Sequence, residues 1–153
     1  GTCRDLEKSE QDDLKASGQN YGIRLNVEKA LSLCSNLYWE DERHGMQEAT
    51  PEIFGDVILA RKDIATSYHL SVCVDDHIQD IDLVIRGEDL FQSTHIHRLL
   101  QALLGLRTPV YHHHRLIIGE DGKRFAKRDK SLTLKSLRET GHEVDDLLLG
   151  MGL

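Results

Sequence analysis

An amphipathic segment between two short apolar runs is the feature that most constrains the fold of this chain. The segment from Ser93 to Gly105 places apolar side chains at helical spacing, with Ser93 or Thr94 as the cap and Gly105 as the end. Its apolar face consists of Ile96, Leu99, Leu100, Leu103 and Leu104. Short apolar runs at 83–85 and 110–118 predict strands on either side. This strand–helix–strand order predicts a parallel sheet covered by helices.

The rest of the chain predicts shorter elements around that unit. Residues 40–51 are polar and predict a loop, with a further strand possible near Tyr38 and Trp39. The segment 67–79 alternates like a strand but also pairs residues at helical spacing, so periodicity leaves it open. The other predicted elements are helices over 9–16, 133–139 and 144–149, and strands over 21–27 and 57–60.

Composition is that of an ordinary globular domain. Of 153 residues, 39% are hydrophobic and 29% charged, with a formal net charge of −7, so the chain is not a uniformly basic nucleic-acid binder. No apolar run approaches the ~18 residues of a membrane helix, and the charged first residues do not match a signal peptide. The cysteines are widely spaced, which argues against disulfides, and Cys34 and Cys73 are expected to be buried. A cytoplasmic location is expected.

Two polar segments follow predicted strands, where α/β sheets bind ligands. In the glycine-led basic loop 122–129, Lys and Arg side chains are suited to follow nucleotide phosphates, although an exposed basic turn has the same composition. At the end of the 83–85 strand, Arg86 is suited to clamp a carboxylate, and Glu88 and Asp89 could hold hydroxyl or ammonium groups. A fold-stabilising ion pair is the alternative for this second segment.

Together, these two segments resemble the catalytic region of class I glutamyl-tRNA synthetases. Residues 85–89 (Ile-Arg-Gly-Glu-Asp) resemble the strand-end motif of that family, and residues 124–128 (Arg-Phe-Ala-Lys-Arg) resemble its KMSKS-type loop. Flanking stretches match as well, at 55–63, 66–70, 74–77 and 111–114. The resemblance implies an α/β fold, namely the second half of a class I synthetase Rossmann-type parallel sheet with a short helical C-terminal extension.

The resemblance also implies roles for individual residues in the glutamate pocket. Tyr68 resembles the tyrosine that lines this pocket, and Arg86 the arginine that engages the bound amino acid. In the family, the pocket tyrosine and the residue four positions later face the same ligand. This favours a helix over 67–79, with Val72 in the second position.

Further positions resemble the ATP site of the family. Asp89 and Arg124 match positions near the nucleotide. Lys127 matches the loop lysine that meets the ATP phosphates, which makes it the expected catalytic residue. Arg124 and Ala126 stand where the family has the first lysine and the serine of the loop, so the charge is kept and a hydroxyl is lost.

The region after the loop favours one branch of this family. About 25 residues follow it, which resembles the truncated glutamyl-queuosine tRNA synthetases, as do the start of the chain and the histidines at 95–97 and 112–114. The resemblance implies activation of glutamate with ATP and Mg²⁺, then transfer of the glutamyl group to queuosine in the anticodon loop of tRNA(Asp). The expected partners are glutamate and queuosine-bearing tRNA(Asp). The protein is expected to be a monomer that does not associate with a membrane.

The same resemblance divides the chain into three parts and implies further residues of the protein outside this chain. Residues 1–54 correspond to a remnant of the zinc-module and insertion region, 55–130 to the second half of the nucleotide-binding catalytic domain, and 131–153 to a short helical C-terminal segment. The HIGH motif of the family is expected in a further N-terminal half, so the chain is expected to act within a longer protein. A fragment of an ordinary glutamyl-tRNA synthetase and a non-catalytic remnant that binds RNA or protein remain alternatives.

Metal binding is expected only in the intact protein. Cys3 resembles the final ligand of a family zinc module whose other ligands would precede it, and one thiolate cannot complete a tetrahedral site. His95 and His97 point apart on a helix, and residues 112–114 alternate across a strand. These histidines are therefore interpreted as surface or packing residues rather than metal ligands.

Overall fold

A computed structural model describes residues 3–116 and 133–151 of the chain. The chain divides into two compact units, 1–114 and 115–153, and each is described by itself. The second unit contains helices α5 (Leu134–Glu139) and α6 (Val144–Met151), which confirms both helices predicted there. None of the helices in the described ranges has the length and apolar character needed to cross a membrane.

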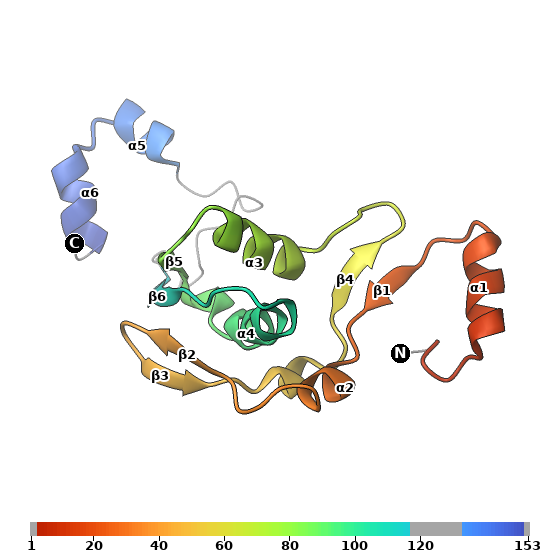
Figure 1. Cartoon of the computed structure of the whole chain (residues 1–153). Coiled ribbons are helices and arrows are strands. Elements are labelled where there is room, and N and C mark those ends of the chain that lie inside the picture. Colours follow the sequence, from red (N-terminus) through yellow and green to blue (C-terminus); the bar gives the residue numbers. More distant parts are fainter. Residues whose placement is uncertain (1–2, 117–132, 152–153) are drawn as a thin grey trace. The chain divides into compact units, whose positions relative to one another are not determined.

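A four-stranded mixed sheet organises the first unit (Figure 1). Its order is β3–β2–β6–β5, and β2, β6 and β5 run parallel, which confirms the predicted α/β fold with a parallel sheet. The antiparallel strand β3 lies at one edge. The strands are β2 (Tyr38–Asp41), β3 (Gly45–Glu48), β5 (Leu83–Gly87) and β6 (Val110–His114).

The loop predicted over 40–51 was wrong, because its first half forms the β2–β3 hairpin. The Asp41 side chain closes the turn by accepting hydrogen bonds from the backbone N–H groups of Arg43 and His44, at 2.9 and 3.0 Å. Gly45 supplies a backbone φ of +71°, which few other residues adopt. Turn chemistry thus overrides the polar composition of this stretch.

Two helices flank the parallel strands. The ambiguous segment 67–79 is helix α3 (Tyr68–Ile78), capped by the Ser67 side chain, as the family resemblance favoured. The central amphipathic segment is helix α4 (Ser93–Leu104), which packs against α3. It ends at Gly105, where φ is +65°, but its N-cap is Gln92, because the short 3₁₀ helix η2 (Glu88–Leu90) lies directly before it.

The strand predicted at 57–60 does not join the parallel sheet. It is β4 (Ile58–Arg61), which pairs antiparallel with β1 (Gly22–Arg24) in a separate two-stranded sheet. The strand predicted over 21–27 is shorter than expected, because β1 ends at Arg24 and helix α2 (Val27–Leu31) begins at Val27. The residues of β1 are exposed. Helix α1 (Lys8–Ala16) has no buried residue.

The hydrophobic core lies between α2, α3 and α4. Helix α4 contributes most of its large side chains, Val57 is part of it, and the 3₁₀ helix η1 (Pro51–Phe54) borders it. Cys73 is buried there as predicted, Cys34 is partly buried against it, and the three cysteines are free. The buried members are Val27, Ala30, Leu37, Val57, Cys73, Ile96, Leu99 and Leu100.

Candidate functional site

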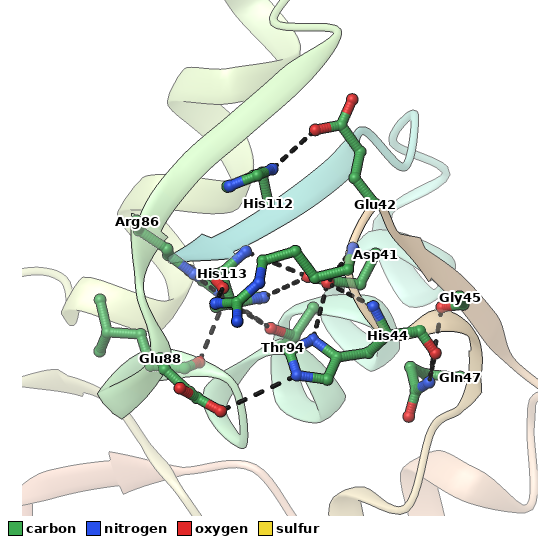
Figure 2. Close-up of polar contacts among 12 residues, drawn as sticks. Asp41, Glu42, His44, Gly45, Gln47, Arg86, Glu88, Thr94, His112 and His113 are labelled. Atoms are coloured by element: carbon green, nitrogen blue, oxygen red, sulfur yellow. Dashed lines mark hydrogen bonds and ion pairs between the residues drawn. The ribbon is translucent and has the colours of Figure 1, made fainter. Parts of the chain in front are cut away.

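Arg86 forms the centre of a buried polar cluster at the carboxyl edge of the parallel strands (Figure 2). It is the second-last residue of β5, and in the parallel register it lies opposite His113 on β6. Asp41, the last residue of β2, lies beyond His113. Ligands of open α/β sheets bind at this edge, so the cluster is placed where binding chemistry is expected.

Every nitrogen of the Arg86 guanidinium has an acceptor. Nε donates to Nε2 of His113 at 3.0 Å, and Nη2 donates to Oγ1 of Thr94 at 2.6 Å and to the Leu90 carbonyl at 3.3 Å. Nη1 contacts Nδ1 of His97 at 3.2 Å and donates to the Tyr68 hydroxyl at 3.5 Å. The side chain is therefore held in one orientation with only 9% of the residue exposed.

All of these acceptors are neutral. Arg86 also lies over the ring of Tyr111, with 5.1 Å between Cζ and the ring centroid. Within the described ranges 3–116 and 133–151, Arg86 forms no ion pair with a carboxylate, so the fold-stabilising ion pair considered from the sequence is not found there. A buried cation without a directly bound anion carries a desolvation cost that no ion pair offsets.

The carboxylate of Asp41 is linked to Arg86 through the ring of His113. Asp41 Oδ2 is 2.6 Å from His113 Nδ1, and Oδ1 is 2.8 Å from His44 Nδ1. Burial by itself raises the pKa of Asp41, but the hydrogen bonds from His113 and His44 outweigh burial and hold that pKa well below its usual range. Asp41 is therefore a permanently charged acceptor one imidazole ring away from the guanidinium.

The histidines around Arg86 are held in their neutral form. Burial, with the nearby Arg86 charge, lowers the pKa of His97 to about 3. Burial also lowers the pKa of His113, against the opposing hydrogen bond to Asp41. His97 Nε2 lies 3.0 Å from His69 Nδ1, and burial lowers the pKa of His69 as well. The site therefore contains one cation surrounded by neutral imidazoles.

The structure brings Tyr68 and Arg86 together, as the resemblance implied for the glutamate pocket. Tyr68 begins α3 and is 50% exposed, so its hydroxyl lies between the buried guanidinium and solvent. Asp89 is exposed in η2, immediately after β5. Arg124 and Lys127 lie outside the described residues. Their predicted contact with ATP phosphates stays a prediction.

The described residues do not fit a zinc site. Cys3 is exposed, and over 3–116 and 133–151 no group of three or more His, Cys, Asp or Glu side chains is arranged to hold a metal ion. The role of Cys3 as a zinc ligand in a longer protein stays a prediction.

Sequence reasoning missed most of the cluster. Asp41 was placed in a loop, but it is the last residue of β2 and is buried. His97 and His113 are buried, in agreement with the packing alternative, but their hydrogen bonds to Arg86 and Asp41 were not predicted. The triple histidine does alternate across β6, with only the middle side chain fully buried. The alternation of the triple histidine could have indicated His113, because it places the middle side chain on the opposite face from its two neighbours. His113 pairs in register with Arg86 on the neighbouring strand.

A cavity of about 490 Å³ lies elsewhere in the first unit, between α2, β1 and η1. Its lining includes both apolar and charged residues, among them Arg4, Arg24 and Asp56. Arg4 forms an ion pair with Asp56, and Arg24 Nη1 donates to the Asp56 carbonyl at 2.9 Å. None of the described residues that contact Arg86 lines this cavity.

The chain is similar to known aminoacyl-tRNA synthetases. Glutamyl-Q tRNA(Asp) synthetase of Rhodobacter capsulatus is 50% identical over 100% of this chain and 55% of its own length. Its counterpart from Nocardia farcinica is 36% identical over 97% of this chain and 45% of its own length. The chain thus spans about half the length of these two curated relatives.

A solved structure shares the fold. The glutamate tRNA ligase of Elizabethkingia meningosepticum, determined in complex with its amino acid, superposes with a TM-score of 0.63 at 27% identity. The match covers 91% of this chain and 26% of that ligase. Residues 1–152 also match the family described as tRNA synthetases class I (E and Q), catalytic domain. The chain therefore belongs to the catalytic-domain family of the class I glutamyl- and glutaminyl-tRNA synthetases.

Proposed function

We propose that this chain supplies the Arg86 half of a glutamate-activating site. The observation that carries this proposal is a buried guanidinium that has only neutral acceptors among the described residues and meets solvent beside a half-exposed tyrosine. A carboxylate is the ligand that such a group binds most strongly, because charge-assisted hydrogen bonds are about twice as strong as neutral ones. Glutamate provides carboxylates for this purpose.

The geometry indicates where the ligand would enter. The contact from Arg86 Nη1 to the Tyr68 hydroxyl is 3.5 Å, the longest that the guanidinium makes and weak for a hydrogen bond. Tyr68 is also the most exposed partner of Arg86. A ligand carboxylate that approaches from this side can accept from Nη1 and from the tyrosine hydroxyl without displacing the buried contacts.

The proposed reaction has two steps. An oxygen of the glutamate carboxylate attacks the α-phosphorus of ATP, the bond to pyrophosphate breaks, and glutamyl-adenylate forms. A nucleophile on queuosine of tRNA(Asp) then attacks the acyl carbon and AMP leaves. Lys127 and Arg124 would stabilise the charge on the phosphates, Asp89 would contact the nucleotide, and Mg²⁺ would arrive with ATP.

Queuosine as the acceptor rests on the two curated relatives named above. The three-part division at 54/55 and 130/131 is proposed on the same basis, with the HIGH half and the zinc module supplied by a longer, monomeric protein. The same-class alternative is an ordinary glutamate–tRNA ligase, which the 33% identity over 97% of this chain to glutamate–tRNA ligase 2 of Syntrophus aciditrophicus favours.

The test is glutamate-dependent ATP–pyrophosphate exchange, measured on the full-length protein without tRNA. We expect exchange, and we expect Lys127→Ala to reduce it by about 100-fold or more, as the loss of one transition-state donor does. Lys135→Ala, at an exposed lysine of α5, is the control and should leave exchange unchanged. A full-length protein without exchange, or undiminished exchange in Lys127→Ala, would contradict the proposal.

A second assay separates the acceptors. Labelled glutamate is offered with queuosine-containing tRNA(Asp), with the same tRNA lacking queuosine, and with tRNA(Glu). Transfer to the first alone supports the proposed function, and transfer to tRNA(Glu) supports the ordinary ligase. Exchange without transfer to any of them would contradict both acceptor assignments.

A further inference from the structure

The guanidinium of Arg86 is held on two sides by imidazole lone pairs. His113 accepts from Nε, and His97 accepts from Nη1 through Nδ1. Both rings are almost fully buried, and they come from different elements, β6 and α4. Such an arrangement requires one particular tautomer of each ring, because a ring nitrogen that carries a proton cannot accept.

The tautomer of His113 is set by Asp41. The Asp41 carboxylate can only accept, so the 2.6 Å contact places the proton on Nδ1 of His113 and leaves Nε2 as the acceptor for Arg86. For His97, Nδ1 faces the guanidinium and Nε2 faces His69 at 3.0 Å, so the proton lies on Nε2. Hydrogen-bond partners therefore determine both protonation patterns.

We propose that Asp41, His113 and His97 are positioning residues that orient Arg86 for the carboxylate of the amino-acid substrate while keeping its charge available. This inference rests on the proposed function. Asp41 acts through His113 and none of the three touches the substrate. Their shared role is to occupy the inner donors of the guanidinium and leave the outer one, beside Tyr68, for the ligand.

The physical reason is competition between anions. A carboxylate in direct contact with Arg86 would form a charge-assisted pair and oppose binding of a substrate carboxylate. A neutral imidazole satisfies the donor without cancelling the charge. Asp41 is kept one ring away, where it partly compensates the buried charge but cannot replace the ligand. Removal of one partner would also leave a buried charged donor unsatisfied.

The experiment compares four variants of the full-length protein in glutamate-dependent pyrophosphate exchange. We expect His113→Leu to raise the KM for glutamate by about tenfold or more, because a charged donor loses its acceptor. His113→Gln places an amide oxygen near Nε2 and should restore most of that loss. Asp41→Asn should give an intermediate rise. The KM for ATP should change less than about twofold in each.

The fourth variant, Leu99→Ala, controls for stability. Leu99 is fully buried in the apolar core and has no polar contact with Arg86, so it should lower stability without a change in the KM for glutamate. An unchanged glutamate KM in His113→Leu, or equal changes in His113→Leu and His113→Gln, would overturn the proposal. Equal shifts of both KM values would do the same.

A spectroscopic measurement keeps this inference distinct from the proposed function. Nitrogen-15 NMR of the imidazoles at pH 7 should show His113 protonated on Nδ1 and His97 on Nε2, both neutral. Asp41→Asn should weaken the preference at His113 alone. The opposite tautomer or an imidazolium at His113 overturns the positioning role, whereas absence of exchange in the unmodified protein contradicts only the proposed function.

Discussion

Helix α4 is buried on two sides, and the two sides differ in chemistry. One side places Ile96, Leu99 and Leu100 in the hydrophobic core, and the other places Thr94 and His97 against Arg86. The apolar side stabilises the fold by removing hydrocarbon from water, at about 1.5–3 kcal/mol per large side chain. The polar side contributes little net stability, because hydrogen bonds only offset the cost of burying a charge. The two sides are therefore equally buried, but the apolar side stabilises the fold and the polar side positions Arg86.

Removal of the Arg86 charge should have the largest effect on activity and little effect on stability. In Arg86→Met, glutamate-dependent kcat/KM should fall by about 1,000-fold or more, equivalent to about 4 kcal/mol. The free energy of unfolding, measured with urea, should change by less than about 1 kcal/mol, because the desolvation cost of the charge is removed together with its bonds. A loss of stability as large as that of a core truncation would break the comparison.

Truncation on the apolar side should give the converse result. Leu99→Ala should lower the free energy of unfolding by about 3 kcal/mol, because it combines lost burial with a cavity. Leu104→Ala, on the same helix but 49% exposed, should cost less than about 1 kcal/mol. Urea titration with a constant m-value checks both. A similar cost at the two positions would show that the core does not depend on α4 as described.

The polar side should make the fold sensitive to mild acid. His97 has a folded pKa of about 3 against a usual 6.5, so at lower pH the unfolded chain binds a proton that the native state does not. Its contribution is complete above pH 6.5 and is lost towards pH 3, with about 2 kcal/mol lost between pH 6.5 and 5.

Other groups near Arg86 add to this pH dependence or oppose it. Burial raises the pKa of Asp76, which acts in the opposite direction to His97. The lowered pKa values of His69 and His113 act in the same direction as that of His97. Asp41, whose pKa is also lowered, adds a loss only below about pH 4. Unfolding measured from pH 7 to 5 should lose part of its pH dependence in His97→Asn but not in the control His142→Asn, at an exposed histidine. Identical profiles would contradict the neutral state of His97.

The smallest expected effect concerns a polar pair at the boundary of the two sides. Gln101 Nε2 donates to the Tyr111 hydroxyl at 3.0 Å, and burial raises the pKa of Tyr111 to about 12. Tyr111→Phe should lower the free energy of unfolding by about 1 kcal/mol, because it leaves a buried amide without its acceptor. The double variant with Gln101→Met should recover most of this. Additive losses in a double-mutant cycle would show that the pair is not coupled.

Local patterns in the sequence were sufficient for the elements that one stretch of chain specifies alone. The spacing of Ile96, Leu99 and Leu100 predicts α4, and Gly105 predicts its end. Arg86 after a short apolar strand correctly indicated the carboxyl edge of the sheet. The helical assignment of 67–79 needed the family resemblance, because the pattern of apolar residues in this segment fits a strand as well as a helix.

The pairing of distant segments could not be read in this way. The partner of β4 is β1 rather than a parallel strand, and the hairpin after β2 depends on the Asp41 side chain. Those choices depend on which backbone groups find partners once the whole unit is compact. Residue types alone do not specify them.

By itself, the sequence determined the α/β class, the family, the amphipathic helix and the arginine at a strand end, since each follows from spacing or motif over a few tens of residues. Only the tertiary structure decided that Asp41, His113 and His97 surround that arginine, because they come from β2, β6 and α4 and meet through strand register and helix packing. The sequence does not show whether a histidine is solvated or buried, and the tautomer of its neutral ring is set by the groups that hydrogen-bond to it.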